Sequence, residues 1–138
     1  MEFKNNYGTV SITVEDNIII AEFSGNLNIS LVNAFADSLH HYLTPLSGEP
    51  WCYIANCSTL LAATPEAEAG FTSLVKKVKE QNCIASAYIF SSALVFNQMK
   101  RILAKAESQV QLLDCLFNDV DSAKNYVTNQ LNLAKVAQ

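Results

Sequence analysis

The segment from Gly8 to Ser24 constrains the fold more than any other part of the chain. Within it, the stretch Val10–Val14 alternates apolar and polar residues, which is the period of a strand with one buried face. Glu15–Asn17 has the composition of a turn, and Ile18–Phe23 is a mainly apolar run that predicts a second strand. The sequence therefore predicts an antiparallel hairpin whose second strand is covered on both faces.

Four segments after the hairpin have apolar residues at helical spacing, and each begins with a residue that favours a helix start. The expected helix starts are Asn28 or Ser30, Thr64, Ser91 or Ser92, and Asp119 or Asp121. Strand-like runs lie between these helices, at Trp51–Cys57, Ile84–Phe90 and Val110–Leu113 or Val110–Phe117. The order of elements is thus β-β-α-β-α-β-α-β-α.

Strands that are separated by helices need crossover connections, which make neighbouring strands parallel. The chain is therefore predicted to be an α/β protein with a five-stranded mixed sheet and four helices. The N-terminal hairpin is antiparallel and the later strands are parallel. We expect one domain over residues 1–138, because a chain of this length builds one core and is short for two.

The composition narrows the classes of function. Half of the residues are hydrophobic and only 16% are charged, against about 25% in a typical soluble domain. This excludes a disordered chain and indicates that part of the surface is apolar. Nine Lys and Arg against 13 Asp and Glu give a net charge of −4, which argues against a nucleic-acid partner, since phosphate contacts need a basic face.

The first residues lack the pattern of a signal peptide, and no apolar run approaches the length of a membrane span. We therefore expect a cytoplasmic protein with reduced thiols. Cys52, Cys57, Cys83 and Cys115 contain no CxxC pair, so they predict neither a zinc site nor a redox couple. Buried thiols are the simpler interpretation.

The order of elements resembles the STAS domain of anti-sigma-factor antagonists, the SpoIIAA-like family, from about Gly8 to Val127. The most specific stretches are Ile20-Ala-Glu-Phe-Ser-Gly25, Gly48-Glu-Pro-Trp51 and 117–126 (Phe-Asn-Asp-Val-Asp-Ser-Ala-Lys-Asn-Tyr). They look closest to a divergent branch of small bacterial proteins that is also compared with CRAL-TRIO lipid-binding domains. None of these stretches is a catalytic signature, so the resemblance speaks for fold more than for activity.

The resemblance implies a phosphorylatable serine at the helix start after the third strand, within an Asp-Ser-Ser/Thr-Gly-like segment. This chain departs from that pattern, because Asn56 stands in place of the Asp and no Gly follows. Ser58, Thr59 and Thr64 are the residues here that a kinase could modify. Thr64 is better explained as the cap of the following helix.

Catalytic arrangements are not evident in the sequence. His40 and His41 are adjacent on a predicted helix and point about 100° apart, so they cannot share one metal ion without distortion. Glu22 interrupts an apolar strand, and a carboxylate facing solvent explains it more simply than one facing a ligand. The four glycines are too dispersed for a phosphate-binding loop. We expect no enzyme activity, no cofactor and no metal site.

Two apolar segments follow the carboxyl ends of predicted strands, at Thr59–Ala63 and Ala93–Phe96. Open α/β sheets bind ligands outside this end, near the point where the strand order reverses. We therefore expect an apolar lip there, which either is exposed or closes the end of the core. Apolar contact would come from Leu60, Leu61, Leu94, Phe96 and Met99, and attraction for anionic groups from Lys100 and Arg101.

These observations favour a non-catalytic binding module, and two kinds of partner stay open. The first is a nonpolar small molecule or an anionic membrane surface at the lip, which would make the protein cytoplasmic and peripherally membrane-associated. The alternative is a regulatory protein partner of the anti-sigma-antagonist kind, with phosphorylation at Ser58, Thr59 or Thr64. The sequence leaves a homodimer open and does not identify the ligand.

Overall fold

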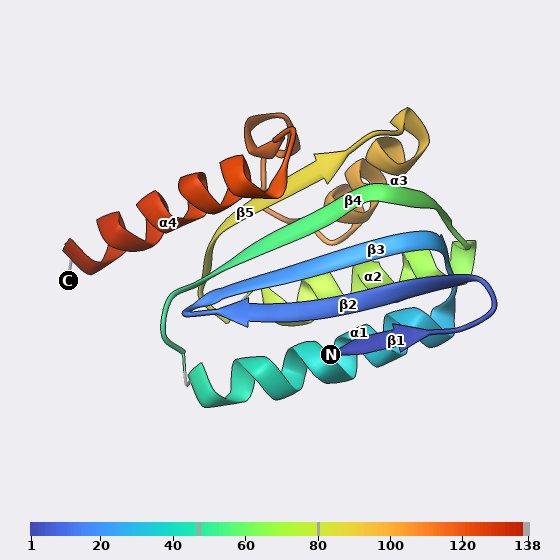
Figure 1. Ribbon diagram of the computed structural model, residues 1–138, viewed down its shortest axis with the longest axis horizontal. Coiled ribbons are helices and arrows are strands. Elements are labelled where there is room, and N and C mark those ends of the chain that lie inside the picture. Colours follow the sequence, from blue (N-terminus) through green and yellow to red (C-terminus); the bar gives the residue numbers. More distant parts are fainter. Residues whose placement is uncertain (47, 80, 137–138) are drawn as a thin grey trace.

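The computed structural model describes residues 1–46, 48–79 and 81–136 (Figure 1). The strands are β1 (Glu2–Lys4), β2 (Gly8–Glu15), β3 (Ile18–Leu27), β4 (Trp51–Ala63) and β5 (Cys83–Phe90). The α-helices are α1 (Ile29–Leu43), α2 (Pro65–Val78), α3 (Ala93–Lys105) and α4 (Val120–Val136). Short 3₁₀ helices lie at Thr44–Leu46 and Leu112–Cys115. Within the described ranges, no helix is long and apolar enough to cross a membrane.

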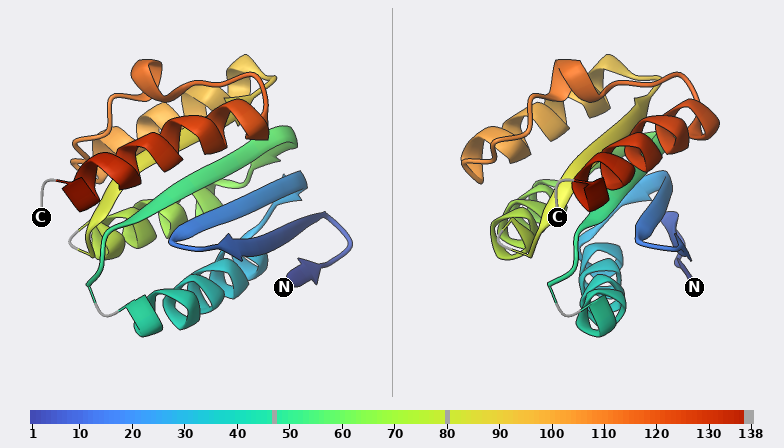
Figure 2. Two further views of the ribbon diagram at one scale, coloured as in Figure 1. Left: turned by 60° about the vertical axis from the view of Figure 1, so that its left-hand side comes forward. Right: turned by 90° about the vertical axis from the view of Figure 1, so that its left-hand side faces the viewer.

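The five strands form one mixed sheet in the order β1-β2-β3-β4-β5. β1, β2 and β3 pair antiparallel, and β3, β4 and β5 pair parallel. Helices α1, α2 and α3 cover one face of the sheet, and α4 covers the other (Figure 2). The predicted α/β class, the mixed five-stranded sheet, the antiparallel hairpin and the four helices are confirmed. The strands follow the chain order, so the described sheet lacks the reversal of strand order expected beside the lip.

The core has two layers, one on each side of the sheet. On the α1–α3 side, Phe23, Phe35 and Phe71 form an aromatic cluster with ring centroids 5.1 to 5.7 Å apart. On the α4 side, Ile54 and Val127 are fully buried among other apolar residues of β3–β5 and α4. β3 supplies side chains to both layers, which accounts for its continuous apolar run.

The prediction of a strand at Val110–Leu113 is wrong. Leu112–Cys115 is a 3₁₀ helix, and only Leu116 bridges to β5, opposite Tyr88. Leu112 is buried while Leu113 is 77% exposed, and the chain passes here from the α3 side of the sheet to the α4 side. An apolar run on such a path mimics a strand in sequence, but the chain does not stay beside β5.

The fifth strand is β1 instead, which pairs with β2. The amide of Ile12 donates to the carbonyl of Met1 over 2.8 Å and extends this pairing to the N-terminal residue. Three residues are too few to show a strand period, so the sequence did not reveal β1. The observed order of elements is β-β-β-α-β-α-β-α-α.

Strands β3 and β4 are both longer than the sequence predicts. Gly25 lies beyond the predicted strand Ile18–Phe23, and its φ of +75° lets β3 continue to Leu27. The segment 58–63, which follows the predicted strand Trp51–Cys57, is the second half of β4 and pairs with the end of β3.

The predicted helix caps are confirmed by side-chain hydrogen bonds to the backbone of the first turn. The capping residues are Asn28 for α1, Thr64 for α2, Ser92 for α3 and Asp119 for α4. Each cap satisfies a backbone N–H that has no partner inside its helix. These caps fix the residue at which each helix begins.

Candidate functional site

Two β-bulges shape the second half of β4. Asn56 and Thr59 are three residues apart, but their partners Glu22 and Ser24 on β3 are two apart, so β4 holds one extra residue there. The amide of Ser58 donates to the side-chain oxygen of Asn56 over 3.1 Å and steadies this first bulge. A bulge bends its strand and changes the direction in which the following side chains point.

Leu61 is the extra residue of the second bulge. Leu60 pairs with Gly25 and Ala62 pairs with Asn26, so Leu61 has no partner on β3. Its side chain is 62% exposed, whereas Leu60 is 7% exposed and belongs to the core. The expectation that Leu60 contributes to an exposed lip is therefore wrong, since the bulges turn Leu60 inward and Leu61 outward.

The end of β4 is tied to the start of α3. The hydroxyl of Ser91 donates to the carbonyl of Ser58. Gln98 forms two hydrogen bonds with the backbone of Ala63, of 3.0 and 2.9 Å. Leu94, in the first turn of α3, is 54% exposed. We call the segments 58–64 and 91–94 the carboxyl edge. It contains two of the expected lip residues, Leu61 and Leu94, in exposed positions.

The other two apolar residues of the expected lip are partly covered. The ring of Phe96 is half-buried and lies edge-on to Phe90, with centroids 5.8 Å apart. Met99 is half-buried and lines a cavity on the sheet face below α3. Neither side chain projects freely from the carboxyl edge.

The two basic residues differ in their surroundings. Lys100 is exposed. Arg101 forms an ion pair with Glu68 of α2, with 2.8 Å between the guanidinium nitrogen and the carboxylate oxygen. Glu68 is mostly covered, with 15% of its side chain exposed, so the carboxylate offsets the charge of Arg101. The positive charge available beside the carboxyl edge is smaller than the sequence suggests.

The three candidate phosphorylation sites lie in the carboxyl edge and are all exposed. Thr64 accepts a hydrogen bond from the amide of Ala67 over 3.1 Å, which confirms its role as a cap. The hydroxyl of Thr59 donates to the carbonyl of Phe23 over 3.5 Å. For Ser58, the hydrogen bonds recorded in the described chain involve only its backbone.

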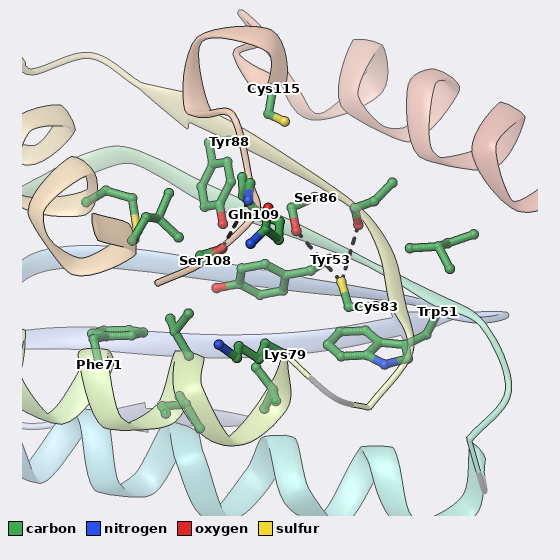
Figure 3. A pocket seen from close by; sticks show the side chains of 18 of the residues that line it. Trp51, Tyr53, Phe71, Lys79, Cys83, Ser86, Tyr88, Ser108, Gln109 and Cys115 are labelled. Atoms are coloured by element: carbon green, nitrogen blue, oxygen red, sulfur yellow. Dashed lines mark hydrogen bonds between the residues drawn. The ribbon is translucent and has the colours of Figure 1, made fainter. Parts of the chain in front are cut away.

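A cavity of about 530 Å³ lies on the opposite half of the same sheet face (Figure 3). Its sheet side is built from residues of β4 and β5, and its other walls come from α1, α2, α3 and the loop at 108–110, with Cys115 and Tyr126 also in the lining. The apolar lining includes Phe35, Leu39, Trp51, Phe71, Leu74, Val75, Val78, Met99 and Leu103. The polar groups of its lining include Tyr53, Ser86, Tyr88, Ser108 and Gln109, and Lys79 is the one charged residue among the described lining residues.

The sequence analysis missed this cavity, apart from Met99. Its lining comes from segments far apart in the chain, and no single segment shows a motif. A weak signal was present in Trp51 and Tyr53 and again in Ser86 and Tyr88, where polar-tipped aromatic or hydroxyl side chains recur on one face of a strand. Tyr53 and Tyr88 lie on neighbouring strands with ring centroids 6.2 Å apart.

The thiols and tyrosines near the cavity are held in their neutral forms. Burial raises the pKa of Cys83 to about 11, although hydrogen bonds with Ser86 and the carbonyl of Ala85 oppose the shift. Burial likewise raises the pKa of Tyr53 and of Tyr88. At neutral pH these groups are hydrogen-bond donors and weak nucleophiles.

Metal-binding geometry is not found in the part of the chain that the structure describes, where no three His, Cys, Asp or Glu side chains gather. His40, His41 and Glu22 are exposed. The four cysteines are free thiols, with Cys52 and Cys57 buried and Cys83 and Cys115 half-buried.

Comparisons with known proteins find similarity in structure alone. No family model and no curated protein sequence matches the chain. An uncharacterised protein of the DUF3478 family from Shewanella loihica PV-4, described as having a SpoIIAA-like fold, matches with a TM-score of 0.66 and 12% identity. The match covers 90% of this chain and 98% of that one.

An anti-sigma factor antagonist from Mycobacterium paratuberculosis matches with a TM-score of 0.60 and 9% identity, over 88% of this chain and 94% of that one. SLC26A9 matches with a TM-score of 0.61 and 11% identity, over 96% of this chain but 25% of that one. At such low identity these likenesses establish the fold and no activity. The expected likeness to CRAL-TRIO domains stays a prediction. The chain therefore has the SpoIIAA-like (STAS) fold, as the resemblance of its sequence to that family implied.

Proposed function

We propose that the protein is a non-catalytic regulatory domain that binds a partner protein at the carboxyl edge. The exposure of Leu61 on the second bulge of β4 is the observation that carries this proposal. The fold supports it, because an anti-sigma factor antagonist shares that fold over most of its length. The partner would be a regulatory protein that covers Leu61 and Leu94.

A bulge interrupts the hydrogen-bonded ladder and weakens the sheet locally. Bulges nevertheless recur at sites where a strand has to redirect a side chain. Here it takes a leucine out of the core face and exposes it, and Leu94 adds a second large apolar side chain at the same edge. Apolar residues that gather on a polar-rimmed surface mark sites of association. Ser58, Thr59 and Thr64 supply a polar rim for hydrogen bonds to a partner.

Phosphorylation at the carboxyl edge would regulate this binding. Ser58 is the preferred site among the three residues, because the hydrogen bonds recorded for it leave its side chain unused. A phosphate on Thr64 would face Glu66 and Glu68 in the first turn of α2. These carboxylates repel a second anion, which disfavours that position.

An anionic membrane surface or a nonpolar ligand at the lip is a weaker proposal. Leu60 is buried and Arg101 is paired with Glu68, so the lip has lost one apolar contact and part of its positive charge. Vesicle flotation tests the membrane hypothesis. Equal recovery of the wild type and a Leu61→Asp/Phe96→Asp variant would rule out membrane binding at the lip.

The partner is tested by affinity isolation of the tagged chain from cells that produce it naturally, followed by rebinding of the purified partner. Leu61→Asp is the test variant and Leu113→Asp is the matched control, since Leu113 is 77% exposed and lies in a different element, the 3₁₀ helix Leu112–Cys115. We expect the partner to bind the wild type and the Leu113→Asp variant alike, and the Leu61→Asp variant at least tenfold more weakly. Equal binding by all three would refute the proposal. Sedimentation of the purified chain tests the homodimer alternative.

A further inference from the structure

We propose that the cavity between α2, α3, β4 and β5 binds a small carboxylic acid with a hydrophobic body. The carboxylate would lie near Lys79 and the hydrophobic body against the apolar walls. This inference goes beyond the proposed regulatory function, because the cavity lies away from the carboxyl edge and shares none of its residues.

The dimensions of the cavity fit such a ligand. Sites for small molecules in proteins have volumes of about 300 to 1,000 Å³, and a volume of 530 Å³ lies within that range. The cavity is partly open, so water fills it unless a ligand displaces that water.

The walls are apolar over most of their extent. Phe71, Leu74 and Val78 present one side of α2 to the cavity, and Met99 and Leu103 present one side of α3. Leu74 and Leu103 are buried, and Met99 is half-buried. Water in such surroundings finds few hydrogen-bond partners, so a hydrocarbon body displaces it favourably.

The polar groups on the sheet side are hydrogen-bond donors. Figure 3 shows Tyr53, Ser86 and Tyr88 on the strands, with Lys79 at the end of α2. Tyr53 is half-buried and lines the cavity from the sheet side. The raised pKa of Tyr53 keeps its hydroxyl protonated, so the hydroxyl can donate to an anion.

The charge of the lining selects the head group. Lys79 is the only charged residue among the described lining residues, and the same set includes no carboxylate. A carboxylate near Lys79 would gain an ion pair in surroundings that water screens only in part. An ammonium head group would meet like charge there, so the cavity distinguishes an acid from an amine of equal length.

The cavity has a route to solvent. Lys79 and Gln109 both line it and both are exposed, whereas Leu74, Tyr88 and Leu103 are buried deeper within it. Lys79 and Gln109 therefore form the rim. A ligand bound with its carboxylate at this rim keeps its charge partly hydrated while its body is buried.

Fluorescence of Trp51 provides the test, because this residue lines the cavity and is the only tryptophan in the chain. The probes are decanoate, decylammonium and 1-decanol, which share one hydrocarbon body. We expect a saturable change with decanoate at micromolar concentration, and at least tenfold weaker binding of decylammonium. Lys79→Gln should weaken the binding of decanoate about tenfold and leave the binding of 1-decanol unchanged.

Two further variants separate this inference from its alternatives. Val75→Phe narrows the cavity from α2 and should abolish the decanoate signal, with folding checked by circular dichroism. Leu61→Asp alters the carboxyl edge alone and should leave decanoate binding unchanged, so failure of the regulatory proposal is measured separately. No saturable response to decanoate, or equal affinity for decanoate and decylammonium, would overturn the proposal.

Discussion

Gly8 and Gly25 face each other across β2 and β3 with no room for a side chain between them. A methyl group on Gly25 would lie 2.7 Å from the carbonyl oxygen of Tyr7 and 3.0 Å from the Cα of Gly8. Because Gly25 can adopt a φ of +75°, β3 continues to Leu27 and holds the bulged end of β4. The glycine pair thus supports the strand that presents Leu61.

This close approach predicts that Gly25→Ala strongly lowers the stability of the protein. The substitution forces a positive φ on alanine and brings its methyl group against backbone atoms, so it should lower the free energy of unfolding by about 2–3 kcal/mol. Gly48→Ala is the matched control, since Gly48 has a φ of +82° but no atom within 4 Å of the added methyl group. It should cost about 1 kcal/mol. Urea unfolding measures both, and equal losses would contradict the close approach.

The register of β4 predicts unequal losses of stability at two neighbouring leucines. Leu60→Ala removes a buried side chain and should cost about 2–4 kcal/mol. Leu61→Ala removes an exposed one and should change stability by less than about 0.5 kcal/mol. Thermal unfolding of the two variants measures both losses of stability. A larger loss for Leu61→Ala would mean that the bulges do not direct these side chains as described.

The caps of the helices predict a difference between Thr64 and Ser58. Thr64→Ala removes the acceptor for the amide of Ala67 and should cost about 1 kcal/mol, while Thr64→Ser should retain most of the stability. Ser58→Ala should be nearly neutral, because the recorded hydrogen bonds of Ser58 use its backbone. Denaturant titration of the three variants measures these losses of stability. A loss for Ser58→Ala as large as that for Thr64→Ala would contradict the prediction.

The buried thiols predict a loss of stability at alkaline pH. Burial raises the pKa of Cys57 to about 12 and that of Cys83 to about 11, whereas an unfolded thiol titrates near pH 8.5. Above that pH the unfolded chain binds fewer protons than the native one, so the free energy of unfolding falls as pH rises. Their contribution is complete below about pH 8.5 and declines between about pH 8.5 and 12.

Urea unfolding at pH 7.5, 9 and 10 measures this decline. Cys57→Ala serves as the comparison, because it removes one of the titrating groups and should give a shallower dependence on pH. The starting stability of this variant will be lower, so the slopes and not the absolute values are compared. Parallel slopes for the two proteins would show that folding does not raise the pKa of Cys57.

The sequence predicted those parts of the fold that depend on local periodicity. The hairpin, the helices and their capping residues Asn28, Thr64 and Ser92 follow from residue spacing and from the backbone groups left free at a helix start. The strand at Val110–Leu113 was predicted wrongly for the same reason. An apolar run indicates burial, but it does not show whether the chain stays beside a neighbouring strand.

The candidate site was less accessible to sequence analysis. Two bulges shift the alternation in β4, so Ser58–Ala63 shows no strand period and Leu60 could not be distinguished from Leu61. The Arg101–Glu68 pair joins two helices, and the cavity joins segments from Phe35 to Tyr126. Such features depend on tertiary contacts between residues distant in sequence, which periodicity does not report.

Site-directed photo-cross-linking in living cells tests the regulatory account most directly. A photoreactive phenylalanine analogue replaces Leu61 in one protein and Leu113 in another, since both side chains are exposed and lie in different parts of the fold. We predict one discrete cross-linked protein from position 61, absent from position 113 and lost when Leu94→Asp is added. The same cross-linked products from both positions, or none from position 61, would contradict the assignment of the carboxyl edge as the docking surface.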